Sequence, residues 1–168
     1  IEGAPTAYTD VMTVKDSGRR TFFHNRGANA LLGPEHYPLD ELDCRILTLG
    51  YLLLLDGMDA EDPEYGTRAA RVLAGCRERG ILTVVDVVSE DSDRFAKVVT
   101  PALPHIDYLV INEIEAARTT GTEIRSGEAL DREALEKAAS ILLERGVKET
   151  VVIHTPEAAF GLPSSGEG

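Results

Sequence analysis

The sequence predicts a Rossmann-like α/β protein: a three-layer sandwich with a mostly parallel sheet and a projecting hairpin near the N-terminus. Apolar strands alternate with amphipathic helices at a spacing of about 30 residues, which is the length of a βαβ unit. The 168 residues fit one domain, and 43% of them are hydrophobic, enough for a core. Aromatic residues make up only 5% of the chain, so aliphatic side chains must fill this core.

The first expected element is the hairpin. Its β-rich arms, residues 9–14 and 20–24, flank the turn-forming residues 16–18 (Asp-Ser-Gly). A loop with short helical pieces follows. We expect residues 1–25 to form the hairpin and residues 26–168 to form an α/β core within a single domain.

Four buried strands are expected after the hairpin, at residues 45–52, 81–88, 106–111 and 150–154. The second is nearly all apolar, as is typical of a parallel strand covered on both faces. A fifth strand after Pro156, at residues 158–162, is expected to pair with the fourth as a hairpin.

Helices are expected between the strands. Residues 66–80 place Ala69, Val72, Leu73 and Cys76 on one face and end at Gly80. A short helix in 93–103 is expected to end near Pro101, and another begins at 112. The clearest helix spans 130–146, with Asp131 as N-cap and Gly146 as its end.

Composition excludes several classes of protein. The net charge of −12 and the pI of about 4.7 repel phosphates, so we expect neither nucleic acid nor an anionic membrane as partner. The longest apolar run, 46–55, is shorter than the roughly 20 residues of a membrane span. The two cysteines, Cys44 and Cys76, form no disulfide framework, which fits a reducing cytoplasm.

The strand ends carry the candidate functional residues, because open α/β sheets bind ligands there. Asn112 and Glu115 stand where a strand passes into a helix. Their spacing is typical of a capping box, which is the more common reading. They could also order a hydrated Mg²⁺, with Glu115 acting through water, and the two roles are compatible.

Other candidates have equally open alternatives. Asp86 ends a strand and could contact a ligand or cap the next loop. His154 has no Cys or His cluster near it, so we expect a hydrogen-bonded structural histidine rather than a metal ligand. In the segment Arg-Gly-Ala-Asn, Arg26 and Asn29 could donate to an anionic or hydroxylated ligand, or the segment could be a plain turn. No G-x-G-x-x-G fingerprint occurs, which disfavours a dinucleotide oxidoreductase.

The order of motifs resembles the central part of the pfkB family of ribokinase-like carbohydrate kinases. The hairpin is followed by FFHNRGANALL, DVVSEDSDRF, YLVINEIEAARTTG and TVVIHTPEAAFGL. The resemblance implies transfer of a phosphoryl group from Mg-ATP to a hydroxyl of a sugar or related small molecule. It implies that Asn112 and Glu115 organise Mg²⁺ and phosphate, and that the hairpin is a lid over the sugar that also mediates homodimer contacts.

The sequence also departs from this family. Asp86 matches the Asp of a D-x-N pattern, but Val88 stands where Asn is usual. The early Gly-Gly segment of the family is not found in this sequence, and neither is the late G-A-G-D motif. The resemblance implies that this late motif supplies the anion hole and the catalytic base. The chain starts at Ile1 and stops at SSGEG, so we expect both ends to be cut and the chain alone to be inactive. The alternative is a non-catalytic ligand-binding or dimerisation module on the same core.

Overall fold

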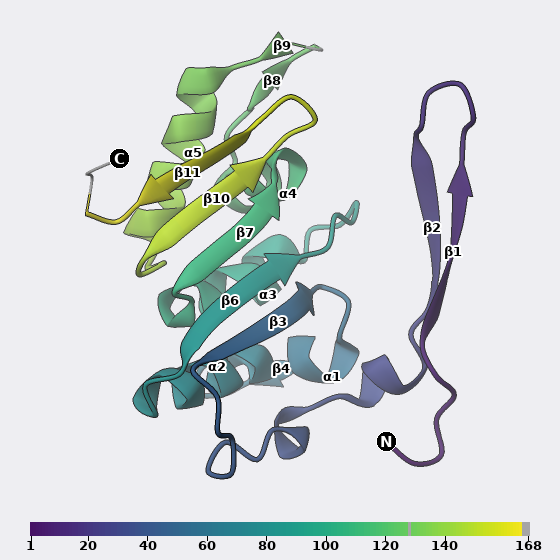
Figure 1. The fold of residues 1–168 in the computed structure, drawn as a ribbon, viewed down its shortest axis with the longest axis vertical. Helices are drawn as coiled ribbons and strands as arrows, with labels where there is room; N and C mark the ends of the chain where they lie inside the picture. Colours follow the sequence, from purple (N-terminus) through teal and green to yellow (C-terminus); the bar gives the residue numbers. More distant parts are fainter. Residues whose placement is uncertain (128, 166–168) are drawn as a thin grey trace.

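The computed structural model describes residues 1–127 and 129–165 and contains a central five-stranded sheet (Figure 1). The strand order is β11-β10-β7-β6-β3. Four strands of this sheet, β3, β6, β7 and β10, are parallel, and β11 pairs antiparallel with β10 at one edge. Their bounds are β3 Ile46–Leu52, β6 Leu82–Val87, β7 Tyr108–Asn112, β10 Thr150–His154 and β11 Ala159–Pro163. The predicted α/β class with a mostly parallel sheet is confirmed.

The helices form one layer against this sheet. They are α2 Arg68–Glu78, α3 Phe95–Ala102, α4 Glu113–Thr120 and α5 Arg132–Glu144, and successive helices are in contact. The cap predictions are confirmed: the Asp131 carboxylate accepts from the Ala134 N–H at 3.0 Å, and Gly146 follows the helix with φ 117°. The helix α3 ends at Ala102, close to Pro101 as expected, and the chain continues as a 3₁₀ turn.

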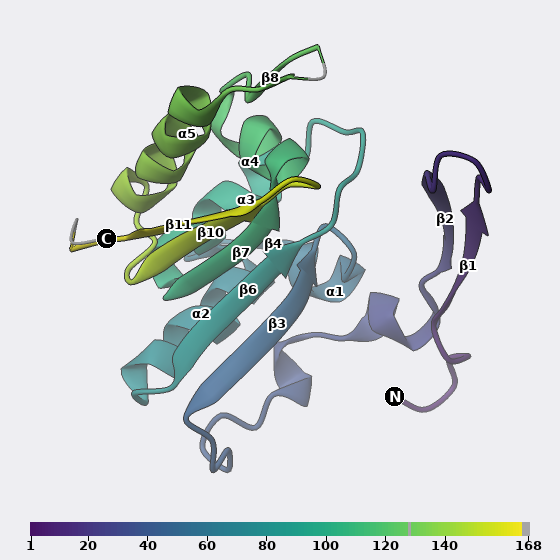
Figure 2. The same cartoon turned by 45° about the horizontal axis from the view of Figure 1, so that its top comes forward.

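One face of the sheet is covered and the other is not. Side chains alternate along each strand: Val85, Leu109 and Ile153 are fully buried beneath the helices, while Val110 and Val152, on the opposite face, are half-buried. We expected parallel strands covered on both faces. The described residues instead supply two of the three expected layers, the sheet and one layer of helices (Figures 1 and 2).

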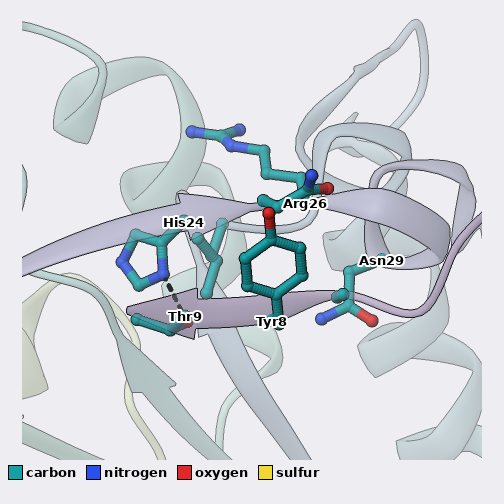
Figure 3. Close-up of a pocket in the computed structure, with 8 residues that line it drawn as sticks. Tyr8, Thr9, His24, Arg26 and Asn29 are labelled. Atoms are coloured by element: carbon teal, nitrogen blue, oxygen red, sulfur yellow. Dashed lines mark hydrogen bonds between the residues drawn. The ribbon is translucent and has the colours of Figure 1, made fainter. Parts of the chain in front are cut away.

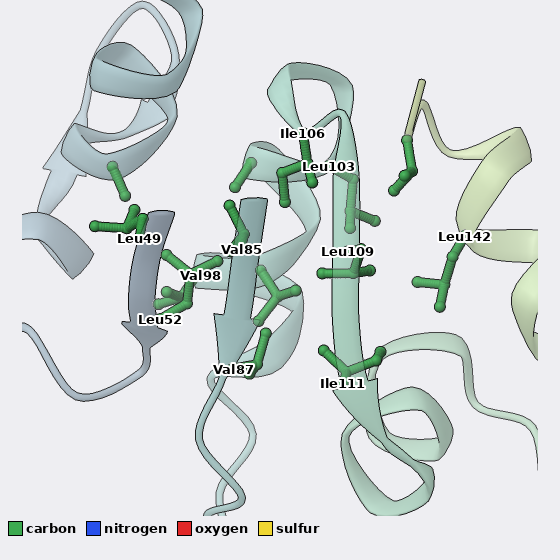
Figure 4. Close-up of a cluster of buried hydrophobic side chains, with 14 of the residues drawn as sticks. Leu49, Leu52, Val85, Val87, Val98, Leu103, Ile106, Leu109, Ile111 and Leu142 are labelled. Atoms are coloured by element: carbon green, nitrogen blue, oxygen red, sulfur yellow. The ribbon is translucent and has the colours of Figure 1, made fainter. Parts of the chain in front are cut away.

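The core lies between the sheet and this helical layer. Leucine, isoleucine and valine fill most of it, as the low aromatic content predicted (Figure 4). Cys76, on the apolar face of α2, is also buried. The largest fully buried side chains include Leu49, Leu52, Leu73, Leu103, Ile106, Leu109, Ile111, Leu142 and Ile153.

The hairpin stands apart from the sheet on the side toward which the parallel strands point (Figures 1 and 2). Its strands, β1 Tyr8–Thr13 and β2 Arg20–Asn25, pair antiparallel from Tyr8 and Asn25 to Thr13 and Arg20. The predicted hairpin is confirmed, and each strand end agrees with the prediction to within one residue.

Short elements complete the chain. These are the 3₁₀ helices η1 Gly27–Leu31, η2 Pro34–His36 and η3 Leu103–His105, the one-turn helix α1 Asp56–Asp59, and the two-residue strands β4 Glu61–Asp62, β5 Gly66–Thr67, β8 Arg125–Ser126 and β9 Ala129–Leu130. The segment SSGEG at the end of the chain lies partly at 166–168, outside the described residues.

Gly27 fixes the base of the hairpin, and its replacement by alanine is expected to open that base. Its φ is 45°, and an added Cβ would lie 2.4 Å from the carbonyl oxygen of Pro5. Overpacking of this kind costs about 1–3 kcal/mol. The Ala28 N–H, which donates to that same oxygen at 2.8 Å, should therefore exchange at least about tenfold faster in Gly27→Ala by hydrogen-exchange NMR.

Gly18→Ala is the matched control for that prediction. Gly18 also has a positive φ, 68°, but no atom lies within 4 Å of an added Cβ. This variant should leave the exchange of the Ala28 amide unchanged. Equal exchange in wild type and Gly27→Ala would contradict the prediction.

Candidate active site

The carboxyl ends of three neighbouring parallel strands bring the first group of predicted residues together. Asp86 lies near the end of β6, Asn112 ends β7, and His154 ends β10 directly opposite Asn112 in the strand register. Glu115 belongs to the first turn of α4, which begins at the next residue after Asn112. This is the edge at which open α/β sheets bind ligands.

Asn112 and Glu115 form the predicted capping box. The Asn112 side-chain oxygen accepts from the backbone N–H groups of Ile114 and Glu115, at 2.9 and 3.0 Å. In return, Glu115 Oε2 accepts from the Asn112 N–H at 2.8 Å. The box satisfies the N–H groups that the start of a helix otherwise leaves unpaired. This confirms the structural reading of the N-x-x-E spacing.

Ser89 is a third member of this network, and the sequence reasoning did not find it. Its hydroxyl donates to Glu115 Oε1 at 2.7 Å, and it accepts from Asn112 Nδ2 at 2.8 Å. Asn112 Nδ2 also donates to Glu115 Oε1 at 2.7 Å. A serine three residues after the strand-end Asp86 was the only available signal, and it is a weak one, because serine is common in loops.

Burial sets the electrostatics of this network. Glu115 is only 3% exposed, and burial raises its pKa, against the lowering effect of hydrogen bonds from Asn112 and Ser89. Burial likewise raises the pKa of Asp86, which accepts from the Val87 N–H at 2.7 Å. The negative charge of Asp86 also contributes to the raised pKa of Glu115.

His154 differs from the expected structural histidine. Its side chain is exposed, and its positive charge, when protonated, lowers the pKa of both Asp86 and Glu115. The register at the end of β10, rather than any sequence pattern, places it opposite Asn112.

The raised pKa of Glu115 predicts a pH dependence of stability. The folded chain holds this proton to a higher pH than the unfolded chain, whose ordinary value is 4.5. The stability it contributes is thus fully present below about pH 4.5 and is lost as the pH rises through the folded pKa. Relative to Glu115→Gln, which cannot ionise, the wild type should be more stable at about pH 4 than at pH 7 in urea unfolding. An unchanged difference between the two proteins would contradict this.

The second group of predicted residues lies at the base of the hairpin. Arg26 and Asn29 line a cavity of about 110 Å³ together with Tyr8, Thr9, His24 and others. Figure 3 shows Tyr8 between His24 and Asn29, with Arg26 beside it. The Thr9 hydroxyl and His24 Nδ1 are hydrogen-bonded at 2.8 Å. Sequence reasoning missed the hairpin residues because only the fold brings β1 beside residues 26–29.

Arg26 forms an ion pair with Asp56, the first residue of α1. Thirty residues separate the two in sequence, so no local pattern indicated this contact. The position of α1 is fixed by close packing, because an added Cβ at Gly57 would lie 2.4 Å from the carbonyl oxygen of Leu32.

The loop after β6 links the two groups of residues. It carries Ser89 at one end and Arg94 at the other, and Arg94 donates to the carbonyl of Leu53 at 3.3 Å and to the Asp59 carboxylate at 2.9 Å. Asp59 in turn accepts from the Leu53 N–H at 3.0 Å. Leu53 has φ 74°, a conformation that is unfavourable for leucine, and these contacts hold it on both sides. The next residue, Leu54, lines the cavity.

Within residues 1–127 and 129–165, no three His, Cys, Asp or Glu side chains converge closely enough to hold a metal ion by themselves. The buried carboxylate of Glu115 beside Asp86 fits Mg²⁺, which takes one or two carboxylates and keeps several waters. None of the helices in this part of the chain has the length and apolarity that crossing a bilayer requires.

Fold and site together define an α/β protein with polar residues gathered at the carboxyl edge of a parallel sheet and a hairpin beside that edge. The model of the pfkB family carbohydrate kinases matches residues 1–160. The chain therefore belongs to the pfkB family. No curated protein matches the sequence.

Solved structures of ribokinases and of a pyridoxal kinase share the fold. Ribokinase from Giardia lamblia is 16% identical with a TM-score of 0.69, over 99% of this chain and 48% of that one. Ribokinase from Arabidopsis thaliana, complexed with ribose and ATP, is 19% identical with a TM-score of 0.64, over 97% and 47%. Pyridoxal kinase from Staphylococcus aureus, in complex with ADP, is 19% identical with a TM-score of 0.56, over 95% and 56%. This chain spans about half the length of these structures.

Proposed function

We propose that this chain is the central part of a kinase that transfers a phosphoryl group from Mg-ATP to a hydroxyl of a sugar or related small molecule. The observation that carries the proposal is the network of Ser89, Asn112 and Glu115 at the carboxyl edge of the sheet, in a chain of the pfkB family. Ligands of open α/β folds bind at this edge.

In this proposal, Glu115, Asn112 and Asp86 form the phosphate and Mg²⁺ network. When bound, Mg²⁺ neutralises charge on the transferring phosphoryl group. Both oxygens of Glu115 already accept hydrogen bonds from the protein, so we assign it a contact to the hydrated ion through water rather than a direct one. Burial raises the pKa of Glu115 and so disfavours its charged form. A cation nearby would favour that charged form, so the buried carboxyl fits a site that holds Mg²⁺.

The cavity at the base of the hairpin is the proposed substrate site. Arg26 and Asn29 line it, with Tyr8 and His24 from the hairpin itself. Their hydroxyl, amide and guanidinium groups suit hydroxyls of a small ligand. In the same proposal, residues 1–25 are a lid and residues 26–168 are an incomplete α/β core. Two groups of residues, one for phosphate and one for substrate, then face the same side of the sheet.

The catalytic base and anion hole are proposed to lie elsewhere in the intact protein. The sequence contains no G-A-G-D, and the chain spans about half the length of the kinases whose fold it shares. Phosphoryl transfer depends on positioning, on charge stabilisation and on a residue that orients the nucleophile. Residues 1–168 alone are accordingly proposed to be inactive.

The hairpin supports a further part of the proposal, homodimerisation. Val11, Met12, Val14, Phe22 and Phe23 are all exposed on it, and a two-stranded hairpin is rarely stable without a partner surface. A dimer through the hairpin would also serve the alternative function, a ligand-binding module without catalysis.

We propose a cytoplasmic location for the protein under both functions, since Cys44 and Cys76 are free thiols.

The proposal is tested with the full-length protein and a panel of pentoses, hexoses and nucleosides. Product formation is followed by coupling ADP release to NADH oxidation in the presence of ATP and Mg²⁺. We expect turnover with at least one sugar, and none from residues 1–168 alone. Tight binding of a sugar by the full-length protein without any turnover would favour the non-catalytic module. If the full-length protein neither binds nor turns over any compound of the panel, the proposed function is refuted.

A further inference from the structure

We propose that Asp56 makes the substrate pocket reject phosphorylated sugars, so that the protein acts on uncharged polyhydroxylated substrates. This inference rests on the proposed function, because it assigns the substrate class of the same cavity. It names a specificity residue that lies outside the cavity lining and acts through its ion pair with Arg26.

The cavity offers a phosphate group little positive charge. A wider hollow lies beside the cavity and is lined by Tyr8, Asp10, Phe23, His24, Asn25 and Arg26. Among the described residues that line the cavity and this wider hollow, Arg26 alone has an arginine or lysine side chain. A protein that binds a phosphorylated ligand normally presents arginine or lysine to it, and arginine is preferred because it can bind two oxygens at once. In this chain the single guanidinium already contacts the carboxylate of Asp56.

The carboxylates outnumber that guanidinium. Asp10 lines the wider hollow, and Asp56 lies against Arg26, so one positive and two negative groups surround the site. The whole chain carries a net charge of −12, which adds to the same negative field. A sugar phosphate, with a charge of about −1.5 to −2, would have to displace Asp56 and then lie beside it. Such like-charge contact is a common means of excluding a wrong ligand.

Asp56 is held in place by the backbone rather than by a flexible loop. It is the first residue of α1, and α1 packs on η1 so closely that a Cβ at Gly57 would overlap the Leu32 carbonyl. The backbone that carries Asp56 is therefore fixed near Arg26 before any ligand arrives. Arg26 is oriented by this pair, as a positioned donor for a neutral oxygen would be.

The remaining polar groups suit hydroxyls. Tyr8 and Asn29 line the same cavity as Arg26 (Figure 3). A phenol or an amide both donates and accepts hydrogen bonds, as a sugar hydroxyl does. A mixed set of donors and acceptors around a single neutralised arginine is typical of a site for an uncharged polyol.

The test compares Asp56→Asn with Glu35→Gln in the full-length protein. Glu35→Gln removes one negative charge from a similarly exposed carboxylate, which is paired with Arg68 at 2.7 Å away from the cavity lining. The probes are D-ribose, D-fructose, D-ribose 5-phosphate and D-fructose 6-phosphate, and dissociation constants are measured by calorimetry. The readout is the ratio of the constants for each sugar and its phosphate.

We expect the wild type to bind a neutral sugar at least tenfold more tightly than its phosphate. Asp56→Asn should narrow this ratio at least about fivefold by strengthening phosphate binding, and Glu35→Gln should leave it unchanged. A wild type that prefers a phosphorylated sugar, or an equal change in both variants, would overturn the inference while leaving the proposed function intact. No binding of any of the four sugars, and no turnover of any sugar in the wider panel, would overturn the proposed function and this inference together.

Discussion

Arg94→Ala is expected to lower the free energy of unfolding by about 3 kcal/mol at pH 7, because it leaves a buried carboxylate without its half-buried cation. The Asp59 side chain is only 3% exposed, and Arg94 donates to it at 2.9 Å. Without Arg94, the buried carboxylate keeps the Leu53 N–H as a donor but has no cation beside it. The strained backbone at Leu53 also loses the donor to its carbonyl.

Urea unfolding at two pH values checks this prediction. Burial already raises the pKa of Asp59, and loss of Arg94 raises it further, so Asp59 can escape the penalty by taking up a proton. The destabilisation should therefore be smaller at pH 5 than at pH 7. Adding Asp59→Asn to Arg94→Ala should recover part of the lost stability at pH 7, because the unpaired charge is removed.

Arg118→Ala is the control for Arg94→Ala. Arg118 pairs with Asp91 at 2.6 Å, but both side chains are largely exposed, at 48% and 93%. Exposed pairs contribute about 0–1 kcal/mol, so this variant should unfold almost as the wild type does. If the two arginine variants lose the same stability, Asp59 is not held as a buried charge and the account of the Leu53 turn is wrong.

Glu115→Gln is expected to lower the turnover of the full-length protein in the proposed kinase reaction about 10- to 100-fold, the usual effect of removing an outer-shell partner of a metal. Glutamine retains an oxygen that can accept from the Asn112 N–H, so the capping box and the start of α4 should persist. What is lost is the negative charge beside Asp86. The variant therefore separates the structural role of Glu115 from its proposed role toward Mg²⁺.

Steady-state kinetics at several Mg²⁺ concentrations provide the measurement. The loss of turnover should be accompanied by a higher Mg²⁺ requirement, which a purely structural role would not produce. Glu113→Gln changes the same charge in the same turn of α4, where Glu113 pairs with Arg125 at 2.7 Å. It should alter turnover by no more than a few-fold. Wild-type turnover in Glu115→Gln would show that the N-x-x-E spacing serves only to cap the helix.

The sequence by itself determined the order and type of the elements. Alternating apolar strands and amphipathic helices predicted the mostly parallel sheet, and Asp131 and Gly146 marked the ends of α5. The capping box at Asn112 and Glu115 could also be predicted, because its residues are three apart and interact within one helical turn. Such features depend on local spacing, which the sequence states directly.

Only the tertiary structure decided which distant residues meet. Ser89 reaches Glu115, Asp56 reaches Arg26, and Arg94 reaches Asp59, across separations of 26, 30 and 35 residues. The tertiary structure also places the four helices α2, α3, α4 and α5 on one face of the sheet. The strand sequences did not indicate this, because their side chains are apolar on both faces. Each contact depends on strand order and on the path of loops, and a single sequence does not encode these in any local spacing.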